Sequence, residues 1–288
     1  MSEPVTPLLT GFDSPEGPCF DTAGNLYFVN WLSSSVMRRT PDGEVSEFFN
    51  TGGIPAGLAF HADGSLYVAD EGDDIHGILR IAEGQGEIVV NTYQGQPLNG
   101  ANDLVFDRKG VLYFSDPWRS SATNPVGGFY RLLPDGTLEQ IDTGLQFPNG
   151  VALSPAGDAV YLAETIPNRI LRYAIGPDGG LGPREHWADM PLVSFPEDAA
   201  DDLPTGGPDG MAFDEAGNLY VAYYGGGRVV IFAPDGSPTG EILLPGANVT
   251  NIAFGGPDRR TAVITDVATA SVYTAQVATP GLRLFSGV

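Results

Sequence analysis

A short motif recurs six times along the 288 residues of the chain. Each copy has a two-residue opening, an apolar triplet, a turn and a second apolar strand that begins with Leu-Tyr or a similar pair. The copies are EGPCFDTAGNLYFVN from Glu16, AGLAFHADGSLYVAD from Ala56, NDLVFDRKGVLYFSD from Asn102, NGVALSPAGDAVYLAE from Asn149, DGMAFDEAGNLYVAY from Asp209 and TNIAFGGPDRRTAVIT from Thr250. Because self-similarity at a fixed period is the signature of repeat architectures, this feature constrains the fold more than any other.

Each copy predicts a β-hairpin that opens a longer unit. In four copies a glycine follows the fifth position by four residues and supplies the positive φ angle that such a turn requires. Segments such as FYRLLPDGTLEQI then add a third strand and a second turn. Units of four strands at intervals of about 40 to 47 residues indicate an all-β, six-bladed β-propeller around a central channel, with residues 1–288 as a single domain. The alternative is a sandwich of six hairpins, which does not explain the constant register.

Two further expectations concern the connections of this propeller. Strand-rich segments before Glu16 and after Ala270 are expected to complete one blade together and so close the ring. The interval before Asp209 is longer than the others and contains EHWADMPLVSFPEDAADDLPTGGP. We expect residues from about 182 to 207 to form an acidic insertion that borders the channel mouth, because insertions in repeat proteins occur in the connections between strands.

The charge of the chain limits its partners. The formal net charge is −22, and nucleic acids or anionic membranes bind clusters of Lys and Arg that this sequence lacks. The start MSEPVTPLLTGFDSPEG has neither a basic n-region nor an apolar h-region, and no stretch approaches eighteen apolar residues, so we expect a cytoplasmic protein. The single cysteine, Cys19, cannot form an intrachain disulfide. The sequence does not predict an oligomeric state.

The opening position of each copy predicts a functional site. The innermost strand of each propeller blade runs along the channel, so these positions are expected to form one ring. The ring consists of Glu16, Ala56, Asn102, Asn149, Asp209 and Thr250. Four of its members carry carboxylate or amide oxygens and none is positively charged. Such a set predicts one bound divalent cation, with Ca²⁺ favoured by the hard oxygen ligands and Mg²⁺, Mn²⁺, Zn²⁺ or Fe²⁺ as alternatives. Taken singly, each of these residues is also an ordinary turn former.

Several segments of the chain resemble the senescence marker protein (regucalcin) and gluconolactonase family, from about Glu16 to Thr265. The segments are SPEGPCFD, NDLVFDRKGVLYFSDP, FPNGVALSPAGDAVYLAET, GGPDGMAFDEAGNLYVAYYGGGRV and NIAFGGPD. The resemblance implies a six-bladed propeller, a divalent cation bound by Glu16, Asn149 and Asp209, and an asparagine, Asn102, that contacts the substrate or serves as a further metal ligand. It also implies hydrolysis of sugar lactones or related esters, although members close to diisopropyl fluorophosphatase cleave phosphorus–fluorine bonds at a similar centre.

One position departs from the pattern of the regucalcin-type proteins. Those proteins carry an arginine two residues before the asparagine that matches Asn102, and this chain has Gly100 there. Recognition of an aldonolactone by that arginine is therefore not expected. The neighbouring side chains that are candidates for substrate binding, together with Asn102, are Asn99, Asp103, Trp118 and Arg119. The alternative is that they form a surface loop after the strand LYFSD.

These observations predict a metal-dependent lactonase in which Asp209 is the catalytic base or nucleophile. A carboxylate that is also a metal ligand can receive or direct a proton without moving. The three histidines lie outside the opening positions, so neither a histidine base nor a histidine-based zinc site is expected. Two other classes remain open. One is an organophosphate hydrolase that uses the same metal, and the other is a non-catalytic propeller that binds partners on its face.

Overall fold

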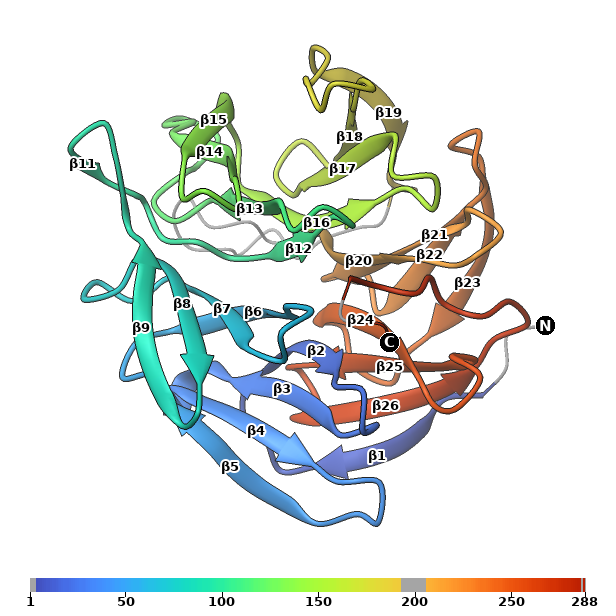
Figure 1. The fold of residues 1–288 in the computed structure, drawn as a ribbon. Helices are drawn as coiled ribbons and strands as arrows, with labels where there is room; N and C mark the ends of the chain where they lie inside the picture. The colour runs from blue at the N-terminus through green and yellow to red at the C-terminus, as the bar shows by residue number, and fades with distance from the viewer. Residues whose placement is uncertain (1–3, 193–205, 286, 288) are drawn as a thin grey trace.

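The computed structural model describes residues 4–192, 206–285 and 287, and these residues form six four-stranded antiparallel sheets around a central axis (Figure 1). Blade 1 consists of β2 (Pro15–Phe20), β3 (Leu26–Asn30), β4 (Ser35–Arg39) and β5 (Val45–Asn50), with a 3-10 turn η1 (Trp31–Ser33) between β3 and β4. Blade 2 consists of β6 (Pro55–Phe60), β7 (Leu66–Asp70), β8 (Gly77–Ala82) and β9 (Gln85–Val90). The six-bladed propeller expected from the repeat is confirmed.

The remaining blades follow the same order from the innermost to the outermost strand. A short hairpin of β10 (Thr92–Tyr93) and β11 (Gln96–Pro97) precedes blade 3, which consists of β12 (Leu104–Phe106), β13 (Leu112–Asp116), β14 (Gly127–Leu132) and β15 (Leu138–Leu145). Blade 4 consists of β16 (Pro148–Leu153), β17 (Ala159–Glu164), β18 (Arg169–Ala174) and β19 (Glu185–Asp189). Blade 5 consists of β20 (Gly207–Phe213), β21 (Leu219–Tyr224), β22 (Arg228–Phe232) and β23 (Pro238–Leu243).

Blade 6 is assembled from both ends of the chain. Its strands are β24 (Val249–Gly255), β25 (Thr261–Asp266) and β26 (Ser271–Gln276) from the C-terminal part and β1 (Thr6–Thr10) from the N-terminal part. The strand β1 pairs with β26 in antiparallel register, with Thr6 opposite Thr274 and Thr10 opposite Ser271. This pairing confirms the closure that the sequence predicts, and it joins the two ends of the ring through backbone hydrogen bonds.

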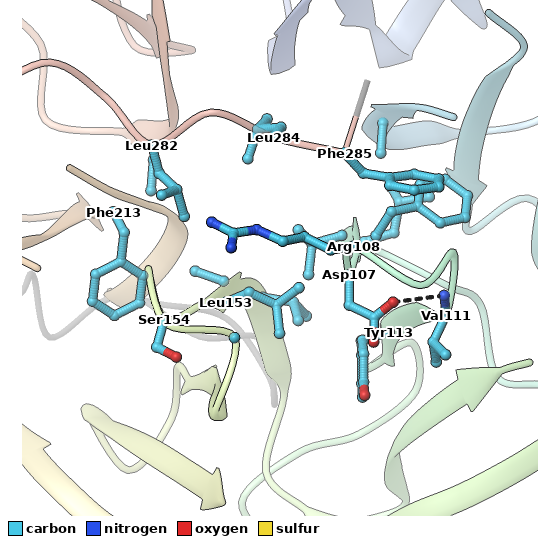
Figure 2. A pocket seen from close by; sticks show the side chains of 18 of the residues that line it. Asp107, Arg108, Val111, Tyr113, Leu153, Ser154, Phe213, Leu282, Leu284 and Phe285 are labelled. Atoms are coloured by element: carbon cyan, nitrogen blue, oxygen red, sulfur yellow. Dashed lines mark hydrogen bonds between the residues drawn. The ribbon is translucent and has the colours of Figure 1, made fainter. Parts of the chain in front are cut away.

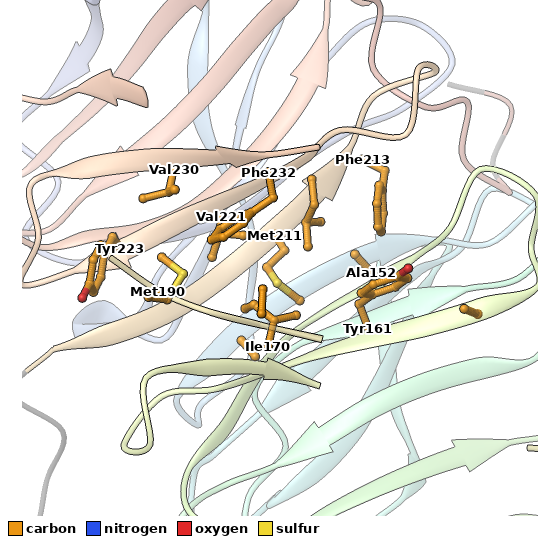
Figure 3. Packing of buried hydrophobic residues seen from close by; sticks show 14 residues of the cluster. Ala152, Tyr161, Ile170, Met190, Met211, Phe213, Val221, Tyr223, Val230 and Phe232 are labelled. Carbon is orange, nitrogen blue, oxygen red and sulfur yellow. The ribbon is translucent and has the colours of Figure 1, made fainter. Parts of the chain in front are cut away.

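The core lies between neighbouring blades, so both faces of the inner strands are buried. The strand β17, for example, is buried at every residue, which explains why it is apolar at most positions instead of alternating. Figure 3 shows the contact between blades 4 and 5. There Ala152 and Tyr161 of blade 4 pack with Met211, Phe213 and Phe232 of blade 5. Similar apolar layers between the other blades hold the six inner strands in place around the channel.

The stretch before Asp209 differs in part from the expected insertion. Residues 185–189 form β19, the outermost strand of blade 4, which pairs with β18. The prediction of a connection is therefore wrong for these residues, because the register Arg172 opposite Glu185 and Arg169 opposite Asp189 makes EHWAD part of the sheet. Residues 193–205, on which the expected position at the channel mouth depends, lie outside the described residues. In the part of the chain that is described, no helix is long and apolar enough to cross a membrane.

Truncation of Phe28 should weaken the closure of the ring. Phe28 is fully buried, packs with Val263 and Val272 of blade 6 and makes an edge contact with Phe12 at 4.9 Å between ring centroids. We expect Phe28→Ala to lower the free energy of unfolding by about 3–5 kcal/mol in urea denaturation, the usual range for a buried phenylalanine. The control Phe48→Ala removes a half-buried ring from the outermost strand β5 and should cost clearly less. Equal losses for the two variants would contradict this assignment.

Candidate functional site

The four polar residues expected in the ring lie at the beginning of four inner strands, at one end of the channel. Glu16 is in β2, Asn149 in β16 and Asp209 in β20, and Asn102 precedes β12 by two residues. The side chains of Glu16, Asn149 and Asp209 are buried, with residue exposures of 6–8%, and Asn102 is half-buried. The Asn149 side chain favours the charged form of the neighbouring Asp209 carboxylate and so lowers its pKa. The inner strands therefore bring polar groups from separate blades to the same end of the channel.

Two glycines allow the inner strands of blades 4, 5 and 6 to approach one another closely. A Cβ atom added to Gly150 would lie 2.1 Å from the carbonyl oxygen of Asp209, and one added to Gly210 would lie 2.0 Å from the Asn251 side chain. Neither position tolerates a side chain without a shift of its neighbour, which is the usual reason for a glycine within a strand. These contacts hold the Asp209 backbone between its two neighbouring strands.

Buried acids at the ends of the second strands fix the segments that lead into the inner strands. The Asp70 carboxylate accepts hydrogen bonds from the backbone N–H groups of Ile54 (2.9 Å) and Gly72 (2.8 Å). Asp116 accepts in the same way from Asn99 (3.0 Å) and Gly100 (2.7 Å). The acid that ends the second strand of these blades therefore accepts hydrogen bonds from backbone N–H groups. These bonds fix the segment that leads into an inner strand.

The two carboxylates of the ring are destabilised in their charged form. Burial raises the pKa of Glu16 well above its usual range, and the carboxylates of Asp209 and Asp103 add to that increase. Burial likewise raises the pKa of Asp209, reinforced by Asp103 and Glu71. No lysine, arginine or histidine is among the described groups that act on either pKa. The charges with the largest effect on these two pKa values are therefore those of other acids at this end of the channel.

The asparagines of the site use their NH₂ groups as donors to these acids. Asn102 Nδ2 donates to Glu71 Oε1 at 2.8 Å. In Asn102 the carbonyl oxygen is thus the atom that remains for a cation or a substrate. Asn251 is different, because its Nδ2 donates to Glu16 Oε1 at 2.9 Å and its Oδ1 accepts from the backbone of Ile252 at 2.7 Å. Asn251 therefore fixes the orientation of Glu16.

Glu71 and Asn251 are site residues that the sequence analysis does not identify. Glu71 is buried and follows β7, so it enters from the connection between the second and third strands of blade 2. Its pKa is raised to about 7, mainly by burial and further by Asp70 and Asp116. Asn251 stands one residue after the opening position, where four other copies have glycine. Asn251 could have been identified from the sequence, because it replaces the glycine that four copies have at the second position. Glu71 lies outside the repeated motif, so the repeat does not identify it.

A divalent cation fits the donors present at this end of the channel. Glu16 Oε2 is a buried oxygen without a hydrogen-bond partner among the described residues, and it belongs to a carboxylate surrounded by other acids. A hard cation is the ligand that satisfies such an oxygen. Within residues 4–192 and 206–285, no three His, Cys, Asp or Glu side chains come together as a metal-binding group. A cation here would therefore depend on amide oxygens as well as on the two carboxylates, as the ring of Glu16, Asn149, Asp209 and Asn102 provides.

The residues expected to contact a substrate divide into two groups. Trp118 and Arg119 lie at the channel end that holds Glu71, because a Cβ atom on Gly100 would be 2.8 Å from Trp118 Cβ and 3.1 Å from Glu71 Cα. Arg119 Nη2 forms an exposed ion pair with Asp73 Oδ1 at 3.0 Å. The other two residues already bind the backbone: Asn99 Nδ2 donates to the carbonyl of Val126 at 3.0 Å, and Asp103 accepts from Leu104 (2.9 Å) and Val151 (2.8 Å).

The fold and the site together define a six-bladed β-propeller with an acidic, amide-rich site at one end of its channel. A family model described as the SMP-30/gluconolactonase/LRE-like region matches residues 14–268. The chain therefore belongs to the SMP-30/gluconolactonase/LRE-like family, and the resemblance inferred from the sequence motifs is confirmed.

Curated relatives and solved structures agree with this membership. A gluconolactonase of Zymomonas mobilis subsp. mobilis is 34% identical over 284 residues, which cover 88% of this chain and 77% of that protein. The lactonase drp35 of Staphylococcus aureus is 34% identical over 236 residues, with coverages of 80% and 70%. The structure of a gluconolactonase from Xanthomonas campestris superimposes with a TM-score of 0.81 at 26% identity, over 96% of this chain and 89% of that one. A calcium-binding regucalcin from Agrobacterium tumefaciens, at 22% identity, shares the fold with a TM-score of 0.79 over 99% and 98% of the two chains.

Neutralisation of Glu71 should stabilise the cation-free protein at alkaline pH. The folded-state pKa of about 7 lies above the ordinary value of 4.5, so the native state keeps a proton that the unfolded state has lost. The contribution of Glu71 to stability therefore falls as the pH rises from about 4.5 to about 7. We expect Glu71→Gln, which retains the acceptor for Asn102, to raise the free energy of unfolding at pH 8 by on the order of 2 kcal/mol. At pH 4, below both pKa values, the difference should nearly vanish.

Urea denaturation with a chelator at the two pH values measures this effect. Glu44→Gln is the matched control, because Glu44 is exposed on a turn and its neutralisation should change the stability little at either pH. A Glu71→Gln protein that is less stable than the parent at pH 8 would show that the ionised carboxylate is favourable in the folded state, contrary to the burial of this group.

Proposed function

We propose that this protein is a divalent-cation-dependent lactonase that acts at the Glu16 end of its channel. The observation that carries the proposal is the unpartnered buried oxygen of Glu16 among acids that no described basic group compensates. The named activity of the gluconolactonase and lactonase relatives supports the reaction class. A chain with a net charge of −22 also favours a neutral or cationic ligand in an acidic site over an anionic one.

The cation would be held by the carboxylates of Glu16 and Asp209 and by the amide oxygens of Asn149 and Asn102. Oxygen donors of this kind favour Ca²⁺, followed by Mg²⁺ or Mn²⁺. When bound, such a cation polarises a lactone carbonyl and lowers the pKa of bound water. The two neutral amides limit the negative charge of the set. Asn251 holds Glu16 in place by its hydrogen bond of 2.9 Å, so the donor oxygen has a fixed position before any ligand arrives.

Asp209 is the residue that we assign to proton transfer. Its carboxylate is buried, and the backbone of Gly210 and the Asn149 side chain favour its charged form. In this role it accepts the proton of the water whose oxygen attacks the lactone carbonyl carbon. The bond between that carbon and the ring oxygen then breaks, and the ring oxygen takes up a proton to become the hydroxyl of the product hydroxy acid.

Substrate binding is assigned to Asn102 and to the neighbouring channel mouth. The NH₂ group of Asn102 is held by Glu71, so its carbonyl oxygen is the atom that it offers either to the cation or to a substrate hydroxyl. Trp118 next to Gly100 offers an apolar face to a lactone ring, and Arg119 is an exposed donor at the rim. Asn99 and Asp103 hold the backbone of this region and would act by positioning Asn102 and the inner strand.

Hydrolysis of lactones should require a divalent cation. We expect turnover of aldonolactones or aliphatic lactones to disappear after dialysis against a chelator and to return on addition of Ca²⁺, Mg²⁺ or Mn²⁺. Organophosphates should be tested in the same series. Hydrolysis of organophosphates alone would assign the site to the phosphorus–fluorine class of enzyme. Cation binding without turnover of any substrate would favour a binding propeller, and full activity in the chelator would reject the cation.

Two substitutions separate the proposed roles of the carboxylates. Asp209→Asn keeps the size and one carbonyl oxygen but removes the proton acceptor, so turnover should stay about 10²-fold or more below the parent even at saturating cation. Glu16→Gln keeps a carbonyl oxygen in a residue assigned to ligation alone, so added cation should restore a larger share of turnover. Calorimetry gives the cation affinity of both variants. Equal recovery of the two would contradict this division of roles, and parental activity in Asp209→Asn would reject the site.

A further inference from the structure

A cavity of about 810 Å³ occupies the end of the channel opposite Glu16. It is lined by the later residues of all six inner strands, by the hairpin loops that follow several of them, and by residues 282–285. The inner strands begin at the candidate site and end at this cavity. Glu16, Asn149 and Asp209 are not among the residues that line it, although its inner limit reaches Gly17, Asp103 and Asn251 beside them.

The C-terminal segment forms one wall of this cavity. Gly281 N donates to the carbonyl of Arg259 at 2.8 Å, and Leu282 N donates to that of Phe213 at 2.9 Å. The ring of Phe285 then lies against His61, at 5.1 Å between ring centroids. Figure 2 shows Leu282, Leu284 and Phe285 along one side of the cavity. The segment thus runs from blade 5 to blade 2 across this end of the propeller.

The body of the cavity is apolar because of the repeat itself. The fifth position of every copy lines it, and the six residues are Phe20, Phe60, Phe106, Leu153, Phe213 and Phe254. An apolar lining with a few polar groups is the usual character of a small-molecule site, and the volume lies within the usual range of about 300–1,000 Å³. A ligand for this cavity therefore needs an apolar body.

Basic side chains that lack a carboxylate partner gather at the same place. Of the fourteen Lys and Arg residues, nine form ion pairs with carboxylates of the described residues. Three of the other five line this cavity, namely Arg108, Lys109 and Arg283. Figure 2 shows the Arg108 side chain extending across the cavity toward Leu282 and Phe213. Arg108 Nη2 donates to the carbonyl of Pro155 at 3.3 Å, which leaves its charge uncompensated within the described residues.

Among the described residues, the carboxylates of the lining form no ion pair with Arg108, Lys109 or Arg283. Each of these carboxylates accepts hydrogen bonds from its own loop or from the adjoining inner strand, and the four are Asp103, Asp107, Asp158 and Asp178. In Figure 2 the Asp107 carboxylate is turned toward Val111 N, to which it is hydrogen-bonded at 2.9 Å, and away from the tip of Arg108. The chain has 36 acidic residues, yet none of those described forms an ion pair with Arg108. The guanidinium group of Arg108 is therefore available to an anionic ligand that enters the apolar cavity.

We propose that this end of the channel binds an aliphatic monocarboxylate, with its chain among the fifth-position side chains and its head at Arg108 and Lys109. The guanidinium group of arginine matches a carboxylate with two parallel N–H···O hydrogen bonds. The apolar chain would remove further surface of the six aromatic and leucine side chains from water. The inference is independent of the lactonase proposal, because it uses none of the residues assigned to the cation or to catalysis.

Calorimetric titration with decanoate tests this inference. The titration is done in a chelator, so that no cation at Glu16 and Asp209 holds the carboxylate. We expect saturable binding of one decanoate per chain, unchanged in Asp209→Asn. Arg108→Gln should weaken the affinity about tenfold or more, because it removes a charged hydrogen-bond donor. Arg172→Gln is the matched control, since Arg172 pairs with Glu185 on the outer strands of blade 4 and lies outside the cavity.

A second pair of measurements separates the site from unspecific uptake of an amphiphile. Leu284 lines the cavity but is 49% exposed, so Leu284→Glu should leave the fold intact and weaken decanoate binding by placing a negative charge beside the head group. Decyltrimethylammonium, a cation with the same chain length, should bind more weakly than decanoate. Non-saturable heats, equal binding of the two amphiphiles, or an Arg108→Gln affinity equal to that of the parent would each overturn the proposal.

Discussion

The close approach of the six inner strands is the constraint on which the rest of the structure depends. At the second position of the repeat, each strand contacts the next one around the channel. In four blades this position is a glycine: a Cβ atom there would lie 2.0–2.6 Å from the nearest atom of the neighbouring strand. In blades 3 and 6 a side chain replaces the glycine and makes the contact itself, since Asp103 accepts from Val151 and Asn251 donates to Glu16. The six contacts close a ring and set how near the opening residues come to one another.

That proximity creates the electrostatic character of the site. Carboxylates brought together by backbone packing cannot move apart, and burial removes the water that would screen them. The pKa of Asp103 rises to about 7 through burial although it accepts two backbone hydrogen bonds, and Glu16 and Asp209 are raised as well. Buried acids with raised pKa values lower the stability of the fold, and groups with such perturbed pKa values are typical of functional sites. A bound cation would offset the repulsion between these carboxylates. The same buried negative charge therefore destabilises the cation-free site and attracts the cation.

The repeat predicts most of the fold and the ring, because both follow from positions within one unit. The closure of β1 on β26 was likewise predictable from apolar segments at the two ends of the chain. Glu71 was not predictable, since its place beside Asn102 depends on the conformation of the connection after β7. The strand β19 was also missed. It is the outermost strand of its blade and its residues Glu185 and His186 are exposed, so EHWAD lacks the apolar pattern that identifies inner strands.

The two ends of the channel differ in polarity because the opening and fifth positions of the repeat have different roles in the packing of the blades. The fifth position must be large and apolar, since its side chains contribute to the packing between blades, as Phe106 and Phe213 do. The opening position contributes little to that packing and is therefore free to carry polar groups. Four residues along a strand separate the two positions by about 13 Å. One set of six strands can thus hold oxygen donors at one end and an apolar cavity at the other. Because the packing of the blades already requires the fifth-position side chains, a basic hairpin such as that of Arg108 and Lys109 is the only addition needed to give the apolar end a preference for anions.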